Sequence, residues 1–305
     1  MSAPKKTQAS QSKLQLWLTG ARLRTLPLAV APVLLGAVMP LASQKFSGLL
    51  TLLALLVAVF LQVGVNYAND YSDGIRGTDA VRVGPQRLVG SGVVEPALVK
   101  SAAFLCFGLA ALAGLAIVGI DLYVGITEAW WLIAIGALSI LAAWYYTGGK
   151  RPYGYAGLGD LMVFIFFGLV ATVGTSFVQQ GYLDQTAVLL GAASGFFACS
   201  VLMVNNYRDR TNDAKVGKKT LSVRVGAGWS KFLFLMDLWL PFGIITLISI
   251  FYPRAMLGWF ALLLVGPATV IFLMAKSPKD LILVLKLSSY AALLFAVLEF
   301  VAFWS

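Results

Sequence analysis

The amino-acid sequence predicts an all-α protein, a polytopic membrane bundle of about nine transmembrane helices around a central cavity. Hydrophobic residues occupy 59% of the 305 positions and charged residues only 12%, whereas soluble domains are about half apolar and a quarter charged. Long apolar segments recur along the chain, bounded by charged residues, Gly or Pro. These observations predict a polar N-terminal tail over 1–21, followed by a single membrane domain over 22–305.

The length of each apolar segment gives the predicted spans in order. A helix needs about 20 predominantly apolar residues to cross the hydrocarbon core of a bilayer. The segments that meet this requirement are 24–43, 48–69, 99–120, 129–147, 158–178, 187–207, 232–251, 255–275 and 281–303.

The distribution of basic residues predicts the orientation. With the N-terminus in the cytoplasm, all of the 23 Lys and Arg residues except Lys45, Arg254 and Lys286 fall on the inner side, as positively charged loops do. A count of eight or ten helices would move a basic loop outside. The net charge of +10 therefore follows from topology, and no motif for nucleic-acid binding accompanies it. We expect a plasma-membrane protein, and the polar first 13 residues carry no cleavable signal peptide.

The residue types that are missing limit the possible chemistry. The chain contains no His, which removes imidazole acid–base catalysis, haem ligation through His and most zinc sites. Cys106 and Cys199 lie inside apolar segments without CxxC spacing, so we expect buried structural thiols. Oxygen ligands remain as the candidates for metal binding.

A pentapeptide recurs at the inner ends of two predicted helices. Asn69-Asp70-Tyr71-Ser72-Asp73 and Asn205-Asn206-Tyr207-Arg208-Asp209 share the pattern N-[DN]-Y-x-D. The segments that follow, about 70–98 and 208–231, are too long and too polar for simple connectors, and we expect them to be catalytic inner loops. An internal duplication would place both copies at the same depth on one side of the membrane.

The first copy carries a polar stripe. Gln62, Asn66, Asn69 and Asp73 are spaced by three and four residues, so they share one helix face. Because polar groups in lipid are costly unless they meet a partner or water, this face should line a cavity. Beyond it, Gly74 and Gly77 should break the helix and let Asp79 fold back.

In the second copy, Asn205, Asp209 and Asp213 also share one helix face. Carboxylates one turn apart repel each other, and a divalent cation removes that repulsion. The all-oxygen set of Asp and Asn suits Mg²⁺, which is usually bound together with substrate phosphates. Nearby Lys and Arg would bind those phosphates. The alternative is that these acids are solvated loop residues that merely flank membrane spans.

These motifs resemble those of the UbiA superfamily of membrane prenyltransferases. Within it, the chain is most similar to the 1,4-dihydroxy-2-naphthoate polyprenyltransferases of menaquinone synthesis. The resemblance spans residues 22 to about 226, and Gly77 stands where many members have a third acid of the first motif. The stretches that carry it are Asn69–Asp73, Asp209-x-x-x-Asp213-x-x-x-Gly217-x-Lys219-Thr220, Arg22-x-Arg24-Thr25-Leu26-Pro27, Val65–Tyr71, Arg82-Val83-Gly84-Pro85 and Lys150-Arg151-Pro152-Tyr153-Gly154-Tyr155-x-Gly157-x-Gly159-Asp160.

The stripe and the resemblance together assign candidate site residues. The expected catalytic residues are Asp73, Asp209, Lys150 and Lys219. The expected Mg²⁺ ligands are Asn69, Asp70, Asp73, Asp79, Asp209 and Asp213, with Asp70 off the stripe and open to an indirect role. The expected substrate-binding residues are Arg22, Arg24, Asn66, Tyr146, Lys150, Arg151, Asp160, Asn205 and Lys219.

The assignments of the basic residues, Asp160 and Tyr146 each have a simpler alternative. The basic residues also fit as positive-inside anchors, Asp160 as a charge at a helix N-terminus, and Tyr146 as part of an aromatic belt.

The resemblance implies transfer of a polyprenyl group from polyprenyl diphosphate to 1,4-dihydroxy-2-naphthoate, with loss of CO₂ and diphosphate, to give demethylmenaquinone. One alternative is a related prenyltransferase acting on 4-hydroxybenzoate or homogentisate. A CDP-alcohol phosphotransferase is disfavoured because Ile75-Arg76-Gly77 breaks that family's motif. A transporter is disfavoured because transport sites lie near the bilayer midplane on broken helices, whereas these acids lie at inner helix ends.

Overall fold

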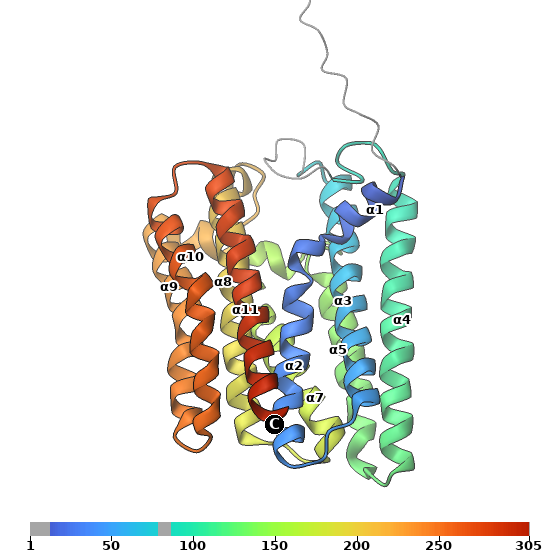
Figure 1. The fold of residues 1–305 in the computed structure, drawn as a ribbon. Helices are drawn as coiled ribbons and strands as arrows, with labels where there is room; N and C mark the ends of the chain where they lie inside the picture. Colours follow the sequence, from blue (N-terminus) through green and yellow to red (C-terminus); the bar gives the residue numbers. More distant parts are fainter. Residues whose placement is uncertain (1–12, 79–86, 305) are drawn as a thin grey trace, which may run out of the picture.

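The computed structural model describes residues 13–78 and 87–304, and these ranges contain helices and connecting loops without a strand (Figure 1). The all-α membrane class is therefore confirmed. The elements in chain order are α1 (Lys13–Ala21), η1 (Leu23–Thr25), α2 (Pro27–Ala42), α3 (Gly48–Ile75), α4 (Pro96–Tyr123), η2 (Thr127–Trp130), α5 (Trp131–Tyr145), η3 (Tyr153–Ala156), α6 (Gly159–Val163), η4 (Phe164–Val170), α7 (Ala171–Gln180), α8 (Gln185–Lys215), α9 (Leu221–Ser249), η5 (Pro253–Ala261), α10 (Leu262–Met274) and α11 (Pro278–Trp304).

Each of the nine predicted segments coincides with a helix, but the count of nine spans is not confirmed. Within the described ranges, seven helices are long and apolar enough to cross a membrane. An eighth span requires joining α1 and η1 to α2 across a bend of 47°. The remaining segment, α5, has only 15 residues. The protein is thus a multi-pass membrane protein in which one crossing is bent and one helix is short.

The second predicted inner loop, 208–231, is mostly helical, which corrects the expectation. Helix α8 continues to Lys215 and α9 begins at Leu221, with a kink at Gly226, where φ is 81°. A search for apolar spans stops at the first charged residues, whereas the 31 residues of α8 extend to roughly 46 Å. That length exceeds the ~30 Å hydrocarbon core. The charged second copy of the pentapeptide is therefore carried on rigid helix.

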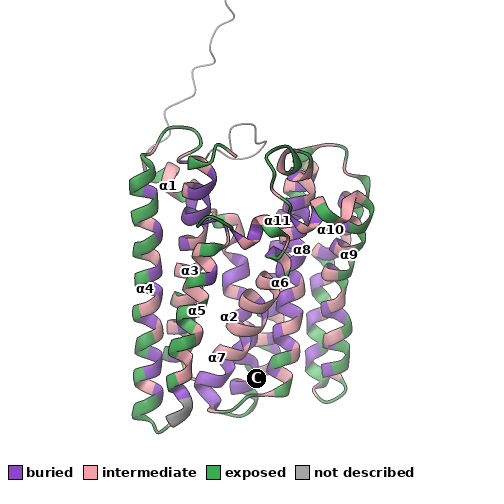
Figure 2. Cartoon of the chain, turned by 180° about the vertical axis from the view of Figure 1, so that it is seen from behind, coloured by how far each residue is buried: buried purple, intermediate pink, exposed green. Residues whose placement is uncertain are grey.

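Helices α2, α8, α9, α10 and α11 pack into the largest apolar core of the described chain. Phe197 of α8 lies edge-on to Phe295 of α11 and to Phe242 of α9, with ring centroids 5.3 and 6.2 Å apart. Buried residues concentrate on α2 and α8, while α4 and α9 expose their outer faces (Figure 2). The last three long helices, α9, α10 and α11, carry no polar motif because they support α8 through apolar packing.

The span Gly159–Gln180 contains a π-helix, η4, over Phe164–Val170. Gly168 in this π-helix packs directly on α8, where a Cβ would lie 2.5 Å from the Cα of Gly195. Only two glycines allow the backbones to approach this closely. Short π-helical stretches often occur at functional sites, and this one lines the cavity described below.

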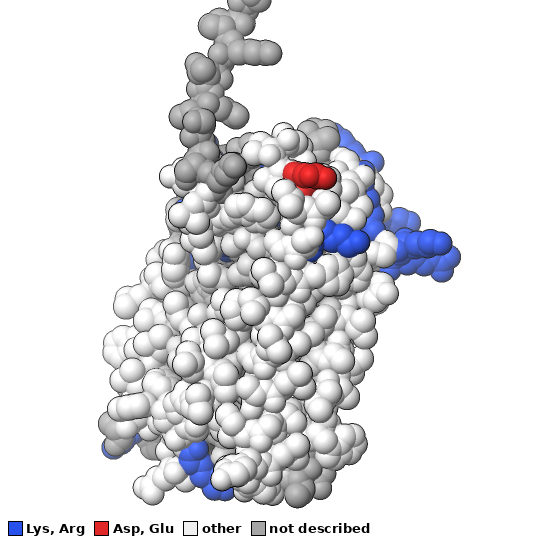
Figure 3. All heavy atoms as spheres, turned by 90° about the vertical axis from the view of Figure 1, so that its right-hand side faces the viewer, with Lys and Arg blue, Asp and Glu red and all other residues white. Residues whose placement is uncertain are grey.

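The C-terminal ends of α3 and α8 lie at the same end of the bundle, which we call the ionic end (Figure 1). On the face shown in Figure 3, most basic side chains gather at this end, and a broad band without charged side chains separates them from a few at the opposite end. This uncharged band is the surface that faces lipid.

Candidate active site

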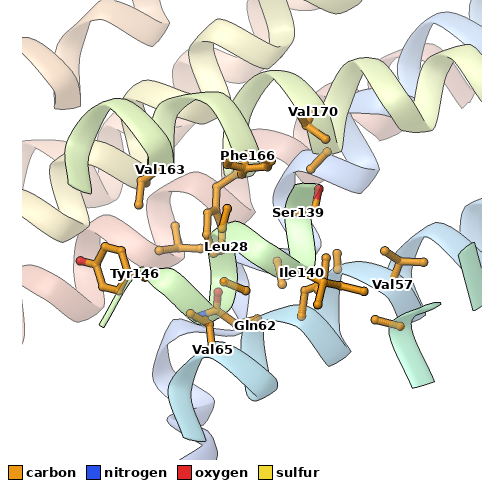
Figure 4. Close-up of a pocket in the computed structure, with 18 of the residues that line it drawn as sticks. Leu28, Val57, Gln62, Val65, Ser139, Ile140, Tyr146, Val163, Phe166 and Val170 are labelled. Atoms are coloured by element: carbon orange, nitrogen blue, oxygen red, sulfur yellow. The ribbon is translucent and has the colours of Figure 1, made fainter. Parts of the chain in front are cut away.

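A cavity of about 560 Å³ runs along the inside of the bundle between α3 and the α6–η4 segment. Val57, Gln62 and Val65 of α3 face Val163, Phe166 and Val170 across it (Figure 4). One face of α3 lines the cavity over its length, through Ala54, Val57, Ala58, Leu61, Gln62, Val65, Asn66, Asn69, Asp70 and Asp73. From Ala54 to Asp73 this face spans about 28 Å at the rise of an α-helix. The predicted polar stripe does line a cavity, and it occupies the ionic end.

The two ends of the cavity differ in character. The ionic end carries Asp73 and the basic residues that line the cavity, Arg22, Arg24, Arg87 and Lys218. The rest of the wall is largely apolar. It includes Leu28, Ala54, Leu61, Ile117, Val118, Leu132, Ile140, Phe166, Phe167 and Val178. The cavity therefore pairs a charged head region with a long apolar shaft.

The shaft also reaches the outer surface of the bundle. Leu115 of α4 and Ile133 of α5 line the cavity, yet both side chains are about half exposed. At α4 and α5 a single layer of side chains therefore separates the shaft from the region occupied by lipid.

Asp73 is the centre of the ionic end. Its Oδ1 accepts a hydrogen bond of 2.6 Å from the hydroxyl of Tyr155, and its Oδ2 lies 3.9 Å from the Nζ of Lys218. Burial raises the pKa of Tyr155, and the nearby negative charge of Asp73 raises it further. Tyr155 therefore keeps its proton and acts as a donor to the carboxylate.

The amide side chains of the stripe hold neighbouring segments in place. Asn69 accepts a hydrogen bond of 2.7 Å from the hydroxyl of buried Thr147, in the loop after α5. Asn66 donates to the carbonyl of Ala21 at 2.9 Å, and Gln62 donates to Thr25 at 3.1 Å. The last two bonds fix the turn between α1 and α2.

That turn carries Arg22 and Arg24, two predicted substrate-binding residues that line the cavity. Arg22 adopts a left-handed conformation with φ 55°, which residues other than Gly rarely adopt. Its Nη2 is buried without a hydrogen-bond partner. Strained backbone and an unpaired buried donor occur together at a position that faces the cavity, as expected of a ligand-binding residue.

Asp70, a predicted metal ligand, lines the cavity and also has a structural role. Its two carboxylate oxygens accept hydrogen bonds of 3.0 Å from the backbone N–H groups of Leu88 and Val89. These bonds anchor the returning end of the loop after α3. The assignment of Asp70 as a metal ligand stays a prediction.

The second acidic segment, which we define as residues 205–220, presents only some of its predicted groups to the cavity. Asn205, Asn206 and Lys218 line the cavity, whereas Asp209 and Asp213 do not. Asp209 is buried and accepts hydrogen bonds of 2.8 and 2.7 Å from Arg208. The first acidic segment comprises residues 69–78. Among the residues that the structure describes, no three acidic side chains come close enough to form a metal cluster, and Asp79 lies outside those residues.

The predicted basic residues divide into two groups. Lys150, Arg151 and Lys219 are exposed and do not line the cavity. Lys218, next to the predicted Lys219, faces Asp73 instead. A left-handed turn at Gly217, with φ 76°, separates this lysine pair from α8, so helical spacing gave no means of choosing between the two.

Tyr146 and Asp160 lie near each other beside the cavity. Tyr146 lines it, and burial followed by the negative charge of Asp160 raises the pKa of its hydroxyl. Asp160 lies in the first turn of α6, and both of its carboxylate oxygens are buried without a hydrogen-bond partner. Tyr155, Thr147 and Lys218 were not predicted from the sequence, although Tyr155 lies within a motif that carries the family resemblance.

This fold and cavity define a multi-pass membrane helix bundle with an internal cavity that is ionic at one end and apolar along the rest of its length. The chain belongs to the UbiA prenyltransferase family, whose model matches residues 29–280. It is 50% identical over 218 residues to a 1,4-dihydroxy-2-naphthoate octaprenyltransferase from Mycobacterium tuberculosis, with 72% of each chain covered.

Solved structures with low sequence identity share the fold. A UbiA homolog from Aeropyrum pernix K1 has a TM-score of 0.70 at 14% identity, covering 90% of this chain and 97% of that one. A UbiA homolog from Archaeoglobus fulgidus bound to GPP and Mg²⁺ has a TM-score of 0.61 at 15% identity, covering 93% of this chain and all of that one.

Proposed function

We propose that this protein transfers a polyprenyl group from polyprenyl diphosphate to 1,4-dihydroxy-2-naphthoate, releasing CO₂ and diphosphate and giving demethylmenaquinol, the reduced form of demethylmenaquinone. The observation that carries the proposal is the union of a charged head region and an apolar shaft in one cavity. A polyprenyl diphosphate has the same two parts, a dianionic or trianionic head and a long hydrocarbon tail. The naphthoate relative from Mycobacterium tuberculosis supports this choice of acceptor.

The ionic end would hold the diphosphate. Arg24, Arg87 and Lys218 supply positive charge around it, and Arg in particular binds phosphate through two parallel hydrogen bonds. These contacts strengthen as negative charge develops on the leaving diphosphate. The basic residues would therefore bind the substrate and favour breaking of the allylic C–O bond.

The donor set of this end fits Mg²⁺. Mg²⁺ takes oxygen ligands and is usually bound by one or two carboxylates together with substrate phosphates and water, so a cluster of three acids is not required. Asp73 and Asn69 would hold it on the first acidic segment, and the family member solved with GPP and Mg²⁺ supports this. When bound, Mg²⁺ neutralises the diphosphate and makes it a better leaving group.

The apolar shaft would hold the polyprenyl tail and keep water away from the allylic carbon. Exclusion of water prevents hydrolysis of a reactive carbon centre. Movement of the thin wall at Leu115 and Ile133 would let the tail and the lipid-soluble product pass into the bilayer. This explains why the enzyme is a membrane bundle.

The naphthoate would lie between the head region and the shaft. The unpaired Nη2 of Arg22 suits its carboxylate, and Tyr146 offers a protonated hydroxyl and an aromatic face. The ring carbon that bears the carboxylate forms the new bond to the allylic carbon as the C–O bond breaks. The bond to the carboxylate then breaks, its electron pair restores the aromatic ring, and CO₂ leaves. This sequence requires no strong base, in agreement with a chain that lacks His.

We place the ionic end at the cytoplasmic side of the plasma membrane. The basic loops of the chain gather at this end, as cytoplasmic loops do. Water-soluble diphosphate would then leave into the cytoplasm.

A panel of acceptors tests the proposal. Purified protein in lipid nanodiscs is incubated with Mg²⁺, a polyprenyl diphosphate and one acceptor at a time, and products are identified by mass spectrometry. We expect prenylation of 1,4-dihydroxy-2-naphthoate, which stops when EDTA removes the metal. Preferential prenylation of 4-hydroxybenzoate or homogentisate would support the related enzyme class instead. No prenylated product from any acceptor would contradict the proposal.

A further inference from the structure

We propose that Tyr155 is a positioning residue that joins the two acidic segments and holds Asp73 in the orientation that receives the metal–diphosphate. This inference rests on the proposed function. Tyr155 belongs to η3, in the loop between α5 and α6, and comes from neither acidic segment. It nevertheless contacts both of them.

Three contacts join Tyr155 to the first acidic segment. Its hydroxyl donates to Asp73 Oδ1 at 2.6 Å, and the Thr78 hydroxyl lies 3.4 Å from the same oxygen atom of Tyr155. The guanidinium of Arg76 lies 5.4 Å from the centre of its ring. Arg76 also donates to the carbonyls of Thr147 and Gly149, in the same loop as Tyr155. The end of α3 is therefore tied to this loop at several points.

Two contacts join Tyr155 to the second acidic segment. Its backbone carbonyl accepts a hydrogen bond of 3.0 Å from the N–H of Lys219. The Nζ of Lys218 lies 4.9 Å from the centre of its ring, within the range of a cation–π interaction. The following loop residues also fit closely here, since a Cβ on Gly157 would lie 2.6 Å from the Nε of Arg224.

The geometry gives these contacts a function. Because Tyr155 occupies Oδ1 of Asp73, the carboxylate plane is fixed and Oδ2 is the oxygen nearest Lys218. The aromatic ring also attracts Lys218, so the lysine stays 3.9 Å from Oδ2 instead of closing into a tight ion pair. Without the hydroxyl, Asp73 is free to rotate onto Lys218, and a metal must compete with the lysine for the carboxylate.

Two variants separate the parts played by the hydroxyl and the ring. Tyr155→Phe removes only the hydrogen bond to Asp73, and Tyr155→Leu also removes the ring that Lys218 and Arg76 contact. Tyr145→Phe is the matched control, because Tyr145 is half exposed at the end of α5 and does not line the cavity. All three proteins are purified in nanodiscs and checked for monodispersity by gel filtration.

Metal binding is measured without turnover, by electron paramagnetic resonance of Mn²⁺ in the presence of inorganic diphosphate. The Mg²⁺ concentration for half-maximal prenyl transfer is measured alongside. For Tyr155→Phe we expect the dissociation constant for Mn²⁺ and the half-maximal Mg²⁺ concentration each to rise about tenfold. This is the size expected when one charge-assisted hydrogen bond is lost. Tyr155→Leu should show a larger rise, and Tyr145→Phe should match the wild type.

Wild-type Mn²⁺ binding and Mg²⁺ dependence in a monodisperse Tyr155→Phe protein would overturn the proposal. A uniform fall in the turnover rate without a change in metal dependence would also overturn it, because that pattern indicates a structural role. If the wild-type protein transfers no prenyl group, the proposed function fails, whereas the Mn²⁺ comparison still decides the role of Tyr155.

Discussion

Oδ2 of Asp73 lies 3.9 Å from Nζ of Lys218, which brings a carboxylate at the end of α3 beside an amine that follows α8. The two residues are 145 positions apart in the chain. Both line the same cavity, and both are needed if a metal and a diphosphate bind between the two acidic segments.

Lys218→Gln should lower kcat/KM for polyprenyl diphosphate by about 10- to 100-fold, because removing a charged partner of a desolvated anion costs about 1.5–3 kcal/mol. Lys219→Gln should cause a smaller loss, since that side chain is exposed and lies outside the cavity wall. Steady-state kinetics of prenyl transfer measures both, with Lys215→Gln on the exposed end of α8 as the control. Equal losses for Lys218 and Lys219 would show that the lysine pair was assigned wrongly.

Asp73→Asn should lower activity and Asp70→Asn should lower stability, although the two residues lie only three positions apart. Asp73→Asn should reduce kcat by about 10²–10³-fold, as loss of one electrostatic contact in an active site commonly does, with little change in thermal stability. Asp70→Asn should lower stability by about 1–3 kcal/mol, because it weakens two bonds that hold the loop at Leu88 and Val89.

Activity assays with increasing Mg²⁺, together with thermal unfolding in detergent, separate the two effects. An Asp70→Asn protein of normal stability that requires much more Mg²⁺ would support Asp70 as a metal ligand.

Arg22→Gln should raise KM for the naphthoate and leave KM for the polyprenyl diphosphate within about threefold. The reason is that the unpaired Nη2 of Arg22 is the donor proposed for the acceptor carboxylate, and charged hydrogen bonds of this kind contribute about 1.5–3 kcal/mol. A competitive inhibitor that lacks the carboxylate should bind the wild type and the variant equally. A larger change in KM for the diphosphate than for the naphthoate would assign Arg22 to the diphosphate instead.

Gly168→Ala should destabilise the bundle by about 1–3 kcal/mol, the usual effect of inserting a methyl group into a packed core. The new Cβ would lie 2.5 Å from Cα of Gly195 and 2.6 Å from the carbonyl oxygen of Gly191, and both are backbone atoms that cannot rotate away. Gly243→Ala in α9 is the control, because its Cβ would meet nothing within 4 Å. Thermal unfolding of both variants in the same detergent measures the difference. Equal midpoints would contradict the close contact between η4 and α8.

Periodicity in the sequence predicted the parts of the site that lie on one helix. Gln62, Asn66, Asn69 and Asp73 repeat at helical spacing, and all of them line the cavity. The same reasoning placed Asn205 on the opposite wall. It did not predict that Arg208 binds both carboxylate oxygens of Asp209, because helical spacing does not reveal the partner of a buried acid.

The parts of the site that depend on loops were beyond such reasoning. Tyr155 meets Asp73 because the α5–α6 loop folds across the end of α3, and Lys218 is chosen over Lys219 by a turn at Gly217. Neither arrangement has a periodic signal, since both depend on contacts between residues far apart in the chain. By contrast, the helical spacing of Asn205, Asp209 and Asp213 predicted that regular helix continues past the apolar span, and α8 does extend to Lys215.

The central claim is that the acceptor is attacked at the carbon that bears its carboxylate. The most direct test supplies 1,4-dihydroxy-2-naphthoate labelled with ¹³C in that carboxylate, together with polyprenyl diphosphate and Mg²⁺, to the purified protein. Labelled CO₂, diphosphate and prenylated product are then quantified in the same reaction. The account predicts one labelled CO₂ and one diphosphate for each prenylated ring. A prenylated product that retains the labelled carboxylate, or release of diphosphate without prenylation, would contradict it.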